Sequence, residues 1–261
     1  MTIGIETIGH VAVIEMQDPP HNFLSPSQVT AVAEALESFE DDPQVRAAVL
    51  CAQGRSFCAG ANFGGDDGPL GAGSEDEPVG GDTTLRLYQG AARLCEVSTP
   101  FIAAVQGPAI GGGLGLAMAA TMRVAAPEAR FSANFAALGI HQGFGLSVLL
   151  PETLGPTRAA EVLLMAKRYT GEEAVAIGLA DRCVPLDQLR DEAIRMATEI
   201  AVNAPLAIRA INRTLRAGLG DRIREATLHE AEQQRWLSST ADAAEGIRAV
   251  GERRPGNFTG T

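Results

Sequence analysis

Glycines 111, 112 and 113 are the residues of this chain whose type and spacing most clearly indicate a ligand site. The apolar run from Phe101 to Val105 is typical of a buried strand, and Leu114 to Ala120 is typical of a small apolar helix. Glycines between a strand and a helix let a ligand approach bare backbone N–H groups, and a helix start favours negative charge. The pattern predicts an anion site, with tight helix–strand packing and no ligand as the alternative.

Two familiar glycine motifs fit this run poorly. The dinucleotide fingerprint needs a glycine where Leu116 stands, and the phosphate loop needs a lysine after its glycines, where this chain has none. A second turn of small residues, at 54–62, also follows a predicted buried strand, Arg46 to Cys51. The two turns are therefore the first places to look for chemistry.

The elements that position these turns alternate between strand and helix over the first 185 residues. The pattern predicts a hairpin of strands at 3–8 and 10–16, a further strand at 122–126, and an extended piece from Arg130. It also predicts helices at 26–40, with Ser25 as N-cap, and at 85–97. After Pro185 the helical ranges are about 187–202, 205–217, 221–238 and 240–250. We expect an α/β fold with a parallel-sheet core at 1–185 and a helical region at 186–261.

The composition excludes some classes of partner. A formal net charge of −11 argues against nucleic acid and against an anionic membrane, although local arginines could still bind a small anion. The four cysteines form no C-x-x-C pair, so we expect reduced thiols in a cytoplasmic protein and no metal site. Neither a signal peptide nor a membrane-spanning run is visible.

GRSFCAGAN at 54–62 and STPFIAAVQGPAIGGGLGLAMA at 98–119 resemble the two signature blocks of the crotonase superfamily, which includes enoyl-CoA hydratases and isomerases. Segments 20–25, 154–185 and 244–258 are similar to further family blocks, in the family's order. The resemblance implies a crotonase-like spiral of ββα units. It also implies an acyl-CoA substrate, so that coenzyme A comes with the thioester and no cofactor is held permanently.

The same resemblance implies that the C-terminal helices build a homotrimer or a dimer of trimers. Their sequence agrees with this expectation because apolar positions on these helices need a partner surface. The positions are Ile208, Ile211, Leu215, Ile223 and Leu228.

In that family two backbone N–H groups form an oxyanion hole for the thioester carbonyl. By resemblance they belong to Ala59 and Gly112. Such a hole stabilises the negative charge that develops on the oxygen when a neighbouring carbon is attacked or deprotonated, and it contributes several kcal/mol.

The family's acid–base carboxylates are missing from this chain. The two glutamate positions of the hydratases are occupied by Gly115 and Phe135, and an aspartate position of some isomerases and dehalogenases is occupied by Gly143. Neither residue type moves a proton, so the resemblance implies an atypical member without the two-glutamate hydration mechanism.

Three other residues are candidates for proton transfer. His141 lies in the glycine-rich loop 139–147, with a local hydrogen-bonding role as the alternative. Tyr88 lies on the predicted helix before Thr99, with aromatic packing as its alternative. Asp66, beside Asp67, lies on a loop at 64–82 that we expect to act as a lid, and solvated charge is its alternative.

Residues near the coenzyme are assigned by resemblance, with Arg55 added as a local phosphate ligand. They are His21, Phe23, Arg55, Ala61, Arg253 and Phe258. The resulting hypothesis is an acyl-CoA-binding hydratase/isomerase-type enzyme of fatty acid metabolism that stabilises a thioester enolate. The alternatives are a catalytically silent acyl-CoA binder and a regulatory partner of active family members.

Overall fold

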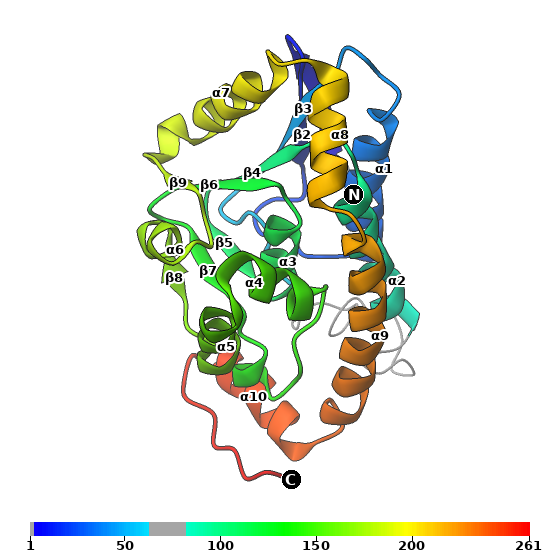
Figure 1. Ribbon diagram of the computed structural model, residues 1–261. Coiled ribbons are helices and arrows are strands. Elements are labelled where there is room, and N and C mark those ends of the chain that lie inside the picture. The colour runs from blue at the N-terminus through cyan, green and yellow to red at the C-terminus, as the bar shows by residue number, and fades with distance from the viewer. Residues whose placement is uncertain (1–2, 63–81) are drawn as a thin grey trace.

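The structure is a computed structural model that describes residues 3–62 and 82–261. Its centre is a six-stranded sheet in the order β1, β2, β3, β4, β6, β9 (Figure 1). The first two strands, β1 (Ile3–Ile8) and β2 (Val11–Met16), form the predicted antiparallel hairpin. The strands that continue the sheet in parallel are β3 (Ala47–Ala52), β4 (Phe101–Val105), β6 (Met122–Ala125) and β9 (Arg182–Cys183).

A smaller sheet lies beside the glycine triplet and consists of β5 (Pro108–Ile110), β7 (Arg130–Ser132) and β8 (Tyr169–Thr170). The strand β4 ends at Val105, before Gly107, and the short strand β5 that begins at Pro108 was not expected from the sequence. Proline is tolerated as the first residue of a strand. Pairing of Ile110 with Ser132 in β7 fixes the point at which the chain enters the glycine turn.

Helix α1 (Pro26–Ser38) begins where predicted, since the Ser25 hydroxyl accepts the N–H of Gln28 at 3.2 Å. It packs beside α2 (Asp82–Glu96), which buries Tyr88. Asp66, Asp67 and nearly all of the lid expected at 64–82 lie outside the described residues.

Each face of the large sheet has its own apolar core because side chains alternate along a strand. On one face Val11 and Val13 of β2 pack in a cluster with Ala193 of α7 (Leu189–Ala201). On the other face Ala12 and Ile14 belong to the cluster that includes α1. Helix α7 is thus a layer of the core although it follows residue 185, and the division into 1–185 and 186–261 stays a prediction.

Helices α3 (Gly112–Met118) and α6 (Gly171–Ile177) contact the small sheet, and the remaining helices complete the molecule. The remaining helices are η2 (Ala136–Leu138), α4 (Leu146–Leu154), α5 (Pro156–Met165), η3 (Leu186–Gln188), α8 (Pro205–Leu215), α9 (Leu219–Leu237) and α10 (Ala241–Gly251). Helix α9 runs along α2, and α10 packs on η2, so the end of the chain folds back over its own middle (Figure 1). No helix within the described ranges is long and apolar enough to cross a membrane.

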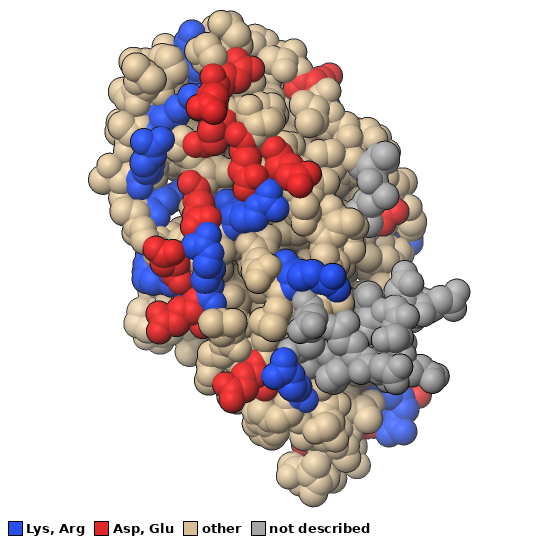
Figure 2. Space-filling view, turned by 90° about the vertical axis from the view of Figure 1, so that its right-hand side faces the viewer, with Lys and Arg blue, Asp and Glu red and all other residues tan. Residues whose placement is uncertain are grey.

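The apolar positions predicted on the C-terminal helices divide into two sets. Ile208 and Ile223 are buried within this chain, whereas Ile211, Leu215 and Leu228 are at least 60% exposed. On the face drawn in Figure 2, acidic and basic side chains are intermixed. The fold as a whole confirms the expected α/β class with a C-terminal helical region.

Candidate active site

The two small-residue turns singled out in the sequence lie side by side. Cys58 forms a parallel bridge with Ala109: its N–H donates to Pro108 O and its carbonyl accepts from Ile110 N, each at 3.0 Å. A Cβ on Gly60 would lie 2.5 Å from Ile110 O, and Gly60 has a φ of +79°. Glycine is therefore required at position 60 for this approach.

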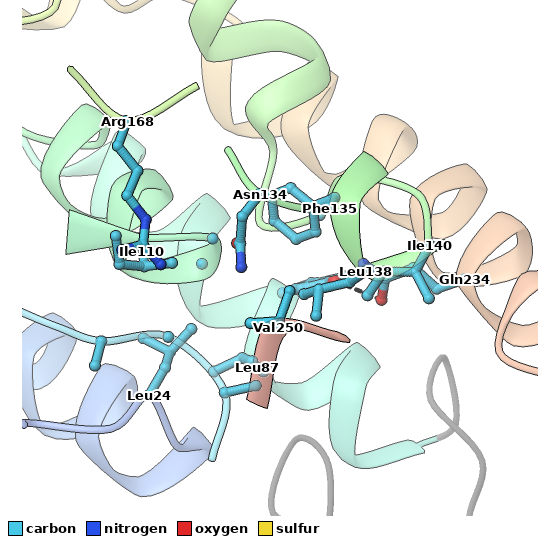
Figure 3. Close-up of a pocket in the computed structure, with 17 residues that line it drawn as sticks. Leu24, Leu87, Ile110, Asn134, Phe135, Leu138, Ile140, Arg168, Gln234 and Val250 are labelled. Atoms are coloured by element: carbon cyan, nitrogen blue, oxygen red, sulfur yellow. Dashed lines mark hydrogen bonds between the residues drawn. The ribbon is translucent and has the colours of Figure 1, made fainter. Parts of the chain in front are cut away.

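A cavity of about 210 Å³ opens where the turns meet (Figure 3). Its walls come from both turns, from α2, from the segment around η2, and from the C-terminal helices. The lining residues are Leu24, Ala59, Gly60, Ala61, Leu87, Tyr88, Ile110, Gly111, Gly112, Asn134, Phe135, Leu138, Ile140, Gly143, Arg168, Gln234 and Val250.

The backbone amides at the cavity wall correct the prediction for Ala59. Its N–H donates to His21 O at 3.0 Å and is not free to bind a ligand. The N–H groups of Ala61 and Gly112, both half-buried, have no hydrogen-bond acceptor in the described part of the chain. The left-handed turn at Gly60 separates the two alanine amides, and this turn is what the sequence could not reveal.

Gly112 lies at the first position of α3, two residues earlier than the helix start expected at Leu114. The first N–H groups of a helix lack partners within the helix, which accounts for the free amide of Gly112. Free donors on two adjoining turns are the arrangement that an oxyanion requires.

Two linked hydrogen bonds connect side chains in the cavity wall to the glycine-rich loop. Tyr88 Oη donates to Gln234 Oε1 at 2.8 Å, and Gln234 Nε2 donates to His141 O at 2.8 Å. Burial, together with the charge of Glu230, raises the pKa of Tyr88 well above its usual value. The Tyr88 hydroxyl therefore stays protonated at ordinary pH and can serve as a donor but not as a base.

His141 contributes its backbone carbonyl to these hydrogen bonds, but its side chain does not line the cavity. The ring lies edge-on to His229, with the centroids 5.8 Å apart, and His141 Nδ1 is 2.8 Å from Gln142 O. The hypothesis of an acid–base role for His141 is thus not supported by its position, whereas Tyr88 lies in the wall as expected.

Aromatic rings and a hydroxyl occupy the space at the three positions to which the resemblance assigns the family's carboxylates. A Cβ on Gly115 would lie 2.6 Å from Phe144 Cδ1, and a Cβ on Gly143 would lie 1.8 Å from Tyr88 Oη. Phe135 itself is 8% exposed and lines the cavity. No aspartate, glutamate or histidine occurs among the described lining residues.

The predicted coenzyme-binding residues fall into two groups. His21, Phe23 and Arg55 lie on two loops that Asn22 joins, since its Nδ2 donates to Gln53 O at 2.7 Å and to Ser56 O at 2.9 Å. Ala61 adjoins them in the cavity wall.

The second group lies beyond α10. Arg253 is exposed there, and Phe258 contributes to a separate groove that also contains Trp236. The structure does not bring Arg253 or Phe258 into the wall of the cavity.

Sequence reasoning missed Asn134, Arg168 and Gln234. Gln234 could have been predicted, because Thr227, Glu230 and Gln234 lie three and four residues apart and therefore share one face of α9. All three polar side chains are buried. Glu230 accepts from Gly145 N at 2.9 Å and Ser147 N at 3.0 Å, and burial raises its pKa. Helix α9 thereby holds the glycine-rich loop that forms one wall.

Comparison with known proteins gives a consistent result. The family model for enoyl-CoA hydratase/isomerase matches residues 6–261. The chain is 36% identical over 255 residues to a Thermus thermophilus protein whose name refers to enoyl-CoA hydratase, with 96% of this chain and 98% of that protein covered. It is 34% identical over 217 residues to a carnitinyl-CoA dehydratase of Proteus mirabilis, with 83% and 80% covered.

Solved structures agree with these relatives. The crystal structure of an enoyl-CoA hydratase/isomerase from Pseudoalteromonas atlantica superimposes with a TM-score of 0.84 at 27% identity, covering 99% of this chain and 100% of that one.

Proposed function

We propose that this chain, which belongs to the enoyl-CoA hydratase/isomerase family, processes an acyl-CoA thioester through an enolate held by the N–H groups of Ala61 and Gly112. The observation that carries the proposal is the pair of unpartnered amides on adjoining turns of one cavity. Loss of a single donor of this kind costs about 2.7–4 kcal/mol of transition-state stabilisation in other enzymes. Coenzyme A arrives as part of the substrate, and no permanent cofactor is proposed.

The first test uses acetoacetyl-CoA, whose enolate has its own ultraviolet absorbance and forms without a base from the protein. Binding should lower the apparent pKa of the ligand, because the two amides stabilise its enolate. Gly112→Pro deletes one N–H at a helix position that accepts proline, whereas Gly112→Ala retains the N–H. Both variants crowd Leu24, since a Cβ would lie 2.4 Å from Leu24 Cδ2.

We expect Gly112→Pro to raise the pKa of the bound ligand by about one unit or more, corresponding to about 1.4 kcal/mol, and Gly112→Ala to change it less. Equal effects of the two variants would show that Gly112 acts through shape and not through its amide.

The reaction proposed differs from two-glutamate hydration. Crotonyl-CoA should be hydrated poorly or not at all, since each missing acid–base group removes about 10²- to 10⁴-fold in rate. Tyr88 supplies a hydrogen-bond donor and not a general acid, because its pKa is raised. If its O–H turns from Gln234 Oε1 to the substrate, we expect Tyr88→Phe to reduce kcat on any acyl-CoA that is turned over by about tenfold or more. Crotonyl-CoA turnover at ordinary hydratase rates would contradict this reading.

A second candidate is a catalytically silent acyl-CoA binder or a regulatory partner of active relatives. It is favoured by the absence of a carboxylate or imidazole among the described lining residues. A panel of acyl-CoA thioesters separates the candidates: a silent binder is thermally stabilised by several of them, by about 2.7 kcal/mol at a hundred times Kd, and turns over none.

For assembly we propose a homotrimer or a dimer of trimers. The exposed Ile211, Leu215 and Leu228 on α8 and α9 support a contact between copies. Light scattering that finds only a 27.2 kDa species at micromolar concentration would contradict it. All four cysteines are free and three are buried, which supports a reducing compartment such as the cytoplasm.

A further inference from the structure

Arg168 is a cation in the cavity wall that the proposed chemistry does not use. It lies between α5 and β8, just after Ala166, whose φ of +49° ends the helix. The neighbouring Lys167 turns to other partners, since its Nζ lies 3.5 Å from Glu173 and 4.9 Å from the centre of the Tyr169 ring. Arg168 instead extends past Ile110 into the cavity (Figure 3).

Arg168 is an exposed residue that forms no ion pair within the described part of this acidic chain. The protein has 32 acidic residues against 21 lysines and arginines, and arginines such as Arg182, Arg190 and Arg224 bind carboxylates. Arg168 has no hydrogen bond or ion pair in the part of the chain that the structure describes. Because no described lining residue is acidic, the cavity wall carries a net positive charge.

Asn134 adds an amide on the same side of the cavity. Its Oδ1 lies 3.4 Å from the position of a Cβ on Gly111, next to the proposed oxyanion hole. Its side chain points into the cavity and, like Arg168, has no hydrogen-bond partner among the described residues (Figure 3). A guanidinium and an amide NH₂ group together provide several N–H donors, and arginine's planar fork matches the geometry of a carboxylate.

The opposite side of the cavity is different. Leu87, Leu138, Ile140 and Val250 are apolar, and the Tyr88 hydroxyl is engaged with Gln234. An acyl chain anchored at its thioester thus meets an apolar wall on one side and free polar donors on the other.

We propose that Arg168 and Asn134 form an anion subsite that binds a carboxylate on the acyl group, so that the substrates are coenzyme A thioesters of short dicarboxylic acids. The inference deepens the proposed function and rests on it, because the oxyanion hole anchors the thioester end. The volume of about 210 Å³ limits the acyl group to a short one.

The test compares glutaryl-CoA with pentanoyl-CoA, which has the same chain length but no carboxylate, and with free coenzyme A. Dissociation constants are measured by calorimetry for the native chain, Arg168→Met and Asn134→Asp. Arg158→Met serves as the matched control, since Arg158 is on neighbouring α5, pairs with Glu161 and does not line the cavity.

We expect the native chain and Arg158→Met to bind glutaryl-CoA at least about tenfold more tightly than pentanoyl-CoA. One charge-assisted hydrogen bond to the additional carboxylate corresponds to about this ratio of dissociation constants. Arg168→Met should abolish this preference while changing the Kd of pentanoyl-CoA less than about twofold. Asn134→Asp should also abolish it, because the new carboxylate repels the ligand and pairs with Arg168.

Two results overturn the subsite while leaving the proposed function intact. One is equal affinity of the native chain for both thioesters. The other is an equal loss of affinity for both thioesters and for free coenzyme A in Arg168→Met, which would assign Arg168 to a coenzyme phosphate. Failure of the native chain to bind any thioester would overturn the subsite and the proposed function together.

Discussion

The contact between Gly115 and Phe144 can be tested by adding a single methyl group. A Cβ at position 115 would lie 2.6, 2.9 and 3.0 Å from Phe144 Cδ1, Cβ and Cγ, and Phe144 is fully buried. Gly115→Ala therefore overpacks the core at a cost of about 1–3 kcal/mol. Alanine recovers about 0.5–1 kcal/mol relative to glycine within a helix, so the net loss is at most about 2.5 kcal/mol.

The same methyl group should be tolerated once the ring is removed. Phe144→Ala alone creates a cavity and costs about 3–5 kcal/mol. In that background Gly115→Ala meets empty space, so only its helix preference remains and stability should rise by about 0.5–1 kcal/mol. The two changes are thus coupled by the relieved overpacking, about 1–3 kcal/mol.

Urea unfolding of the four chains at one protein concentration measures the coupling, through midpoints compared at unchanged slope. Gly251→Ala at the end of α10 is the control, since its Cβ would meet nothing within 4 Å. Additivity of Gly115→Ala and Phe144→Ala within about 0.5 kcal/mol would refute the claim that the Phe144 ring occupies the space beside position 115.

Three further outcomes are expected. Tyr88→Phe leaves Gln234 Oε1 buried without its donor and should lower the free energy of unfolding by about 1–3 kcal/mol in urea titrations; no change would mean that the bond contributes nothing. Hydrogen bonds from Arg195 and Arg182 lower the pKa of Glu192 to about 2. The stabilisation, less than about 1 kcal/mol at this surface site, should be complete above the unfolded pKa near 4.5 and fade as the pH falls toward 2. Unfolding of Glu192→Gln and the native chain between pH 6 and 2 checks this, and a difference that grows toward low pH would reverse the sign. Burial raises the pKa of the Cys58 thiol to about 12, so a thiol reagent should modify Cys58 only in denaturant.

Regular elements with clear periodicity could be predicted from the sequence. The hairpin, α1 with its Ser25 cap, and β4 occur where the apolar pattern indicated. Strand β5 was missed because it has only three residues and begins with proline. Its pairing depends on β7, more than twenty residues later, and local pattern does not encode that pairing.

The candidate site was predicted in part. The two glycine turns and Tyr88 do meet at one cavity, but Ala59 was chosen in place of Ala61 because a positive φ at Gly60 redirects the chain. His141 was expected in the cavity, yet only its carbonyl takes part. Residue type alone does not tell which way a loop side chain turns.

The pairing of Tyr88 with Gln234 joins residues 146 positions apart, which has a consequence for synthesis of the protein. Chains are made from the N-terminus, and domains generally begin to fold while the rest is still being translated. Both proposed oxyanion donors and all the described strands precede residue 184, so they are synthesised before α7 to α10. The wall formed by Gln234 and Val250 can dock only after those residues leave the ribosome, so the cavity of a nascent chain lacks this wall until synthesis has passed residue 250.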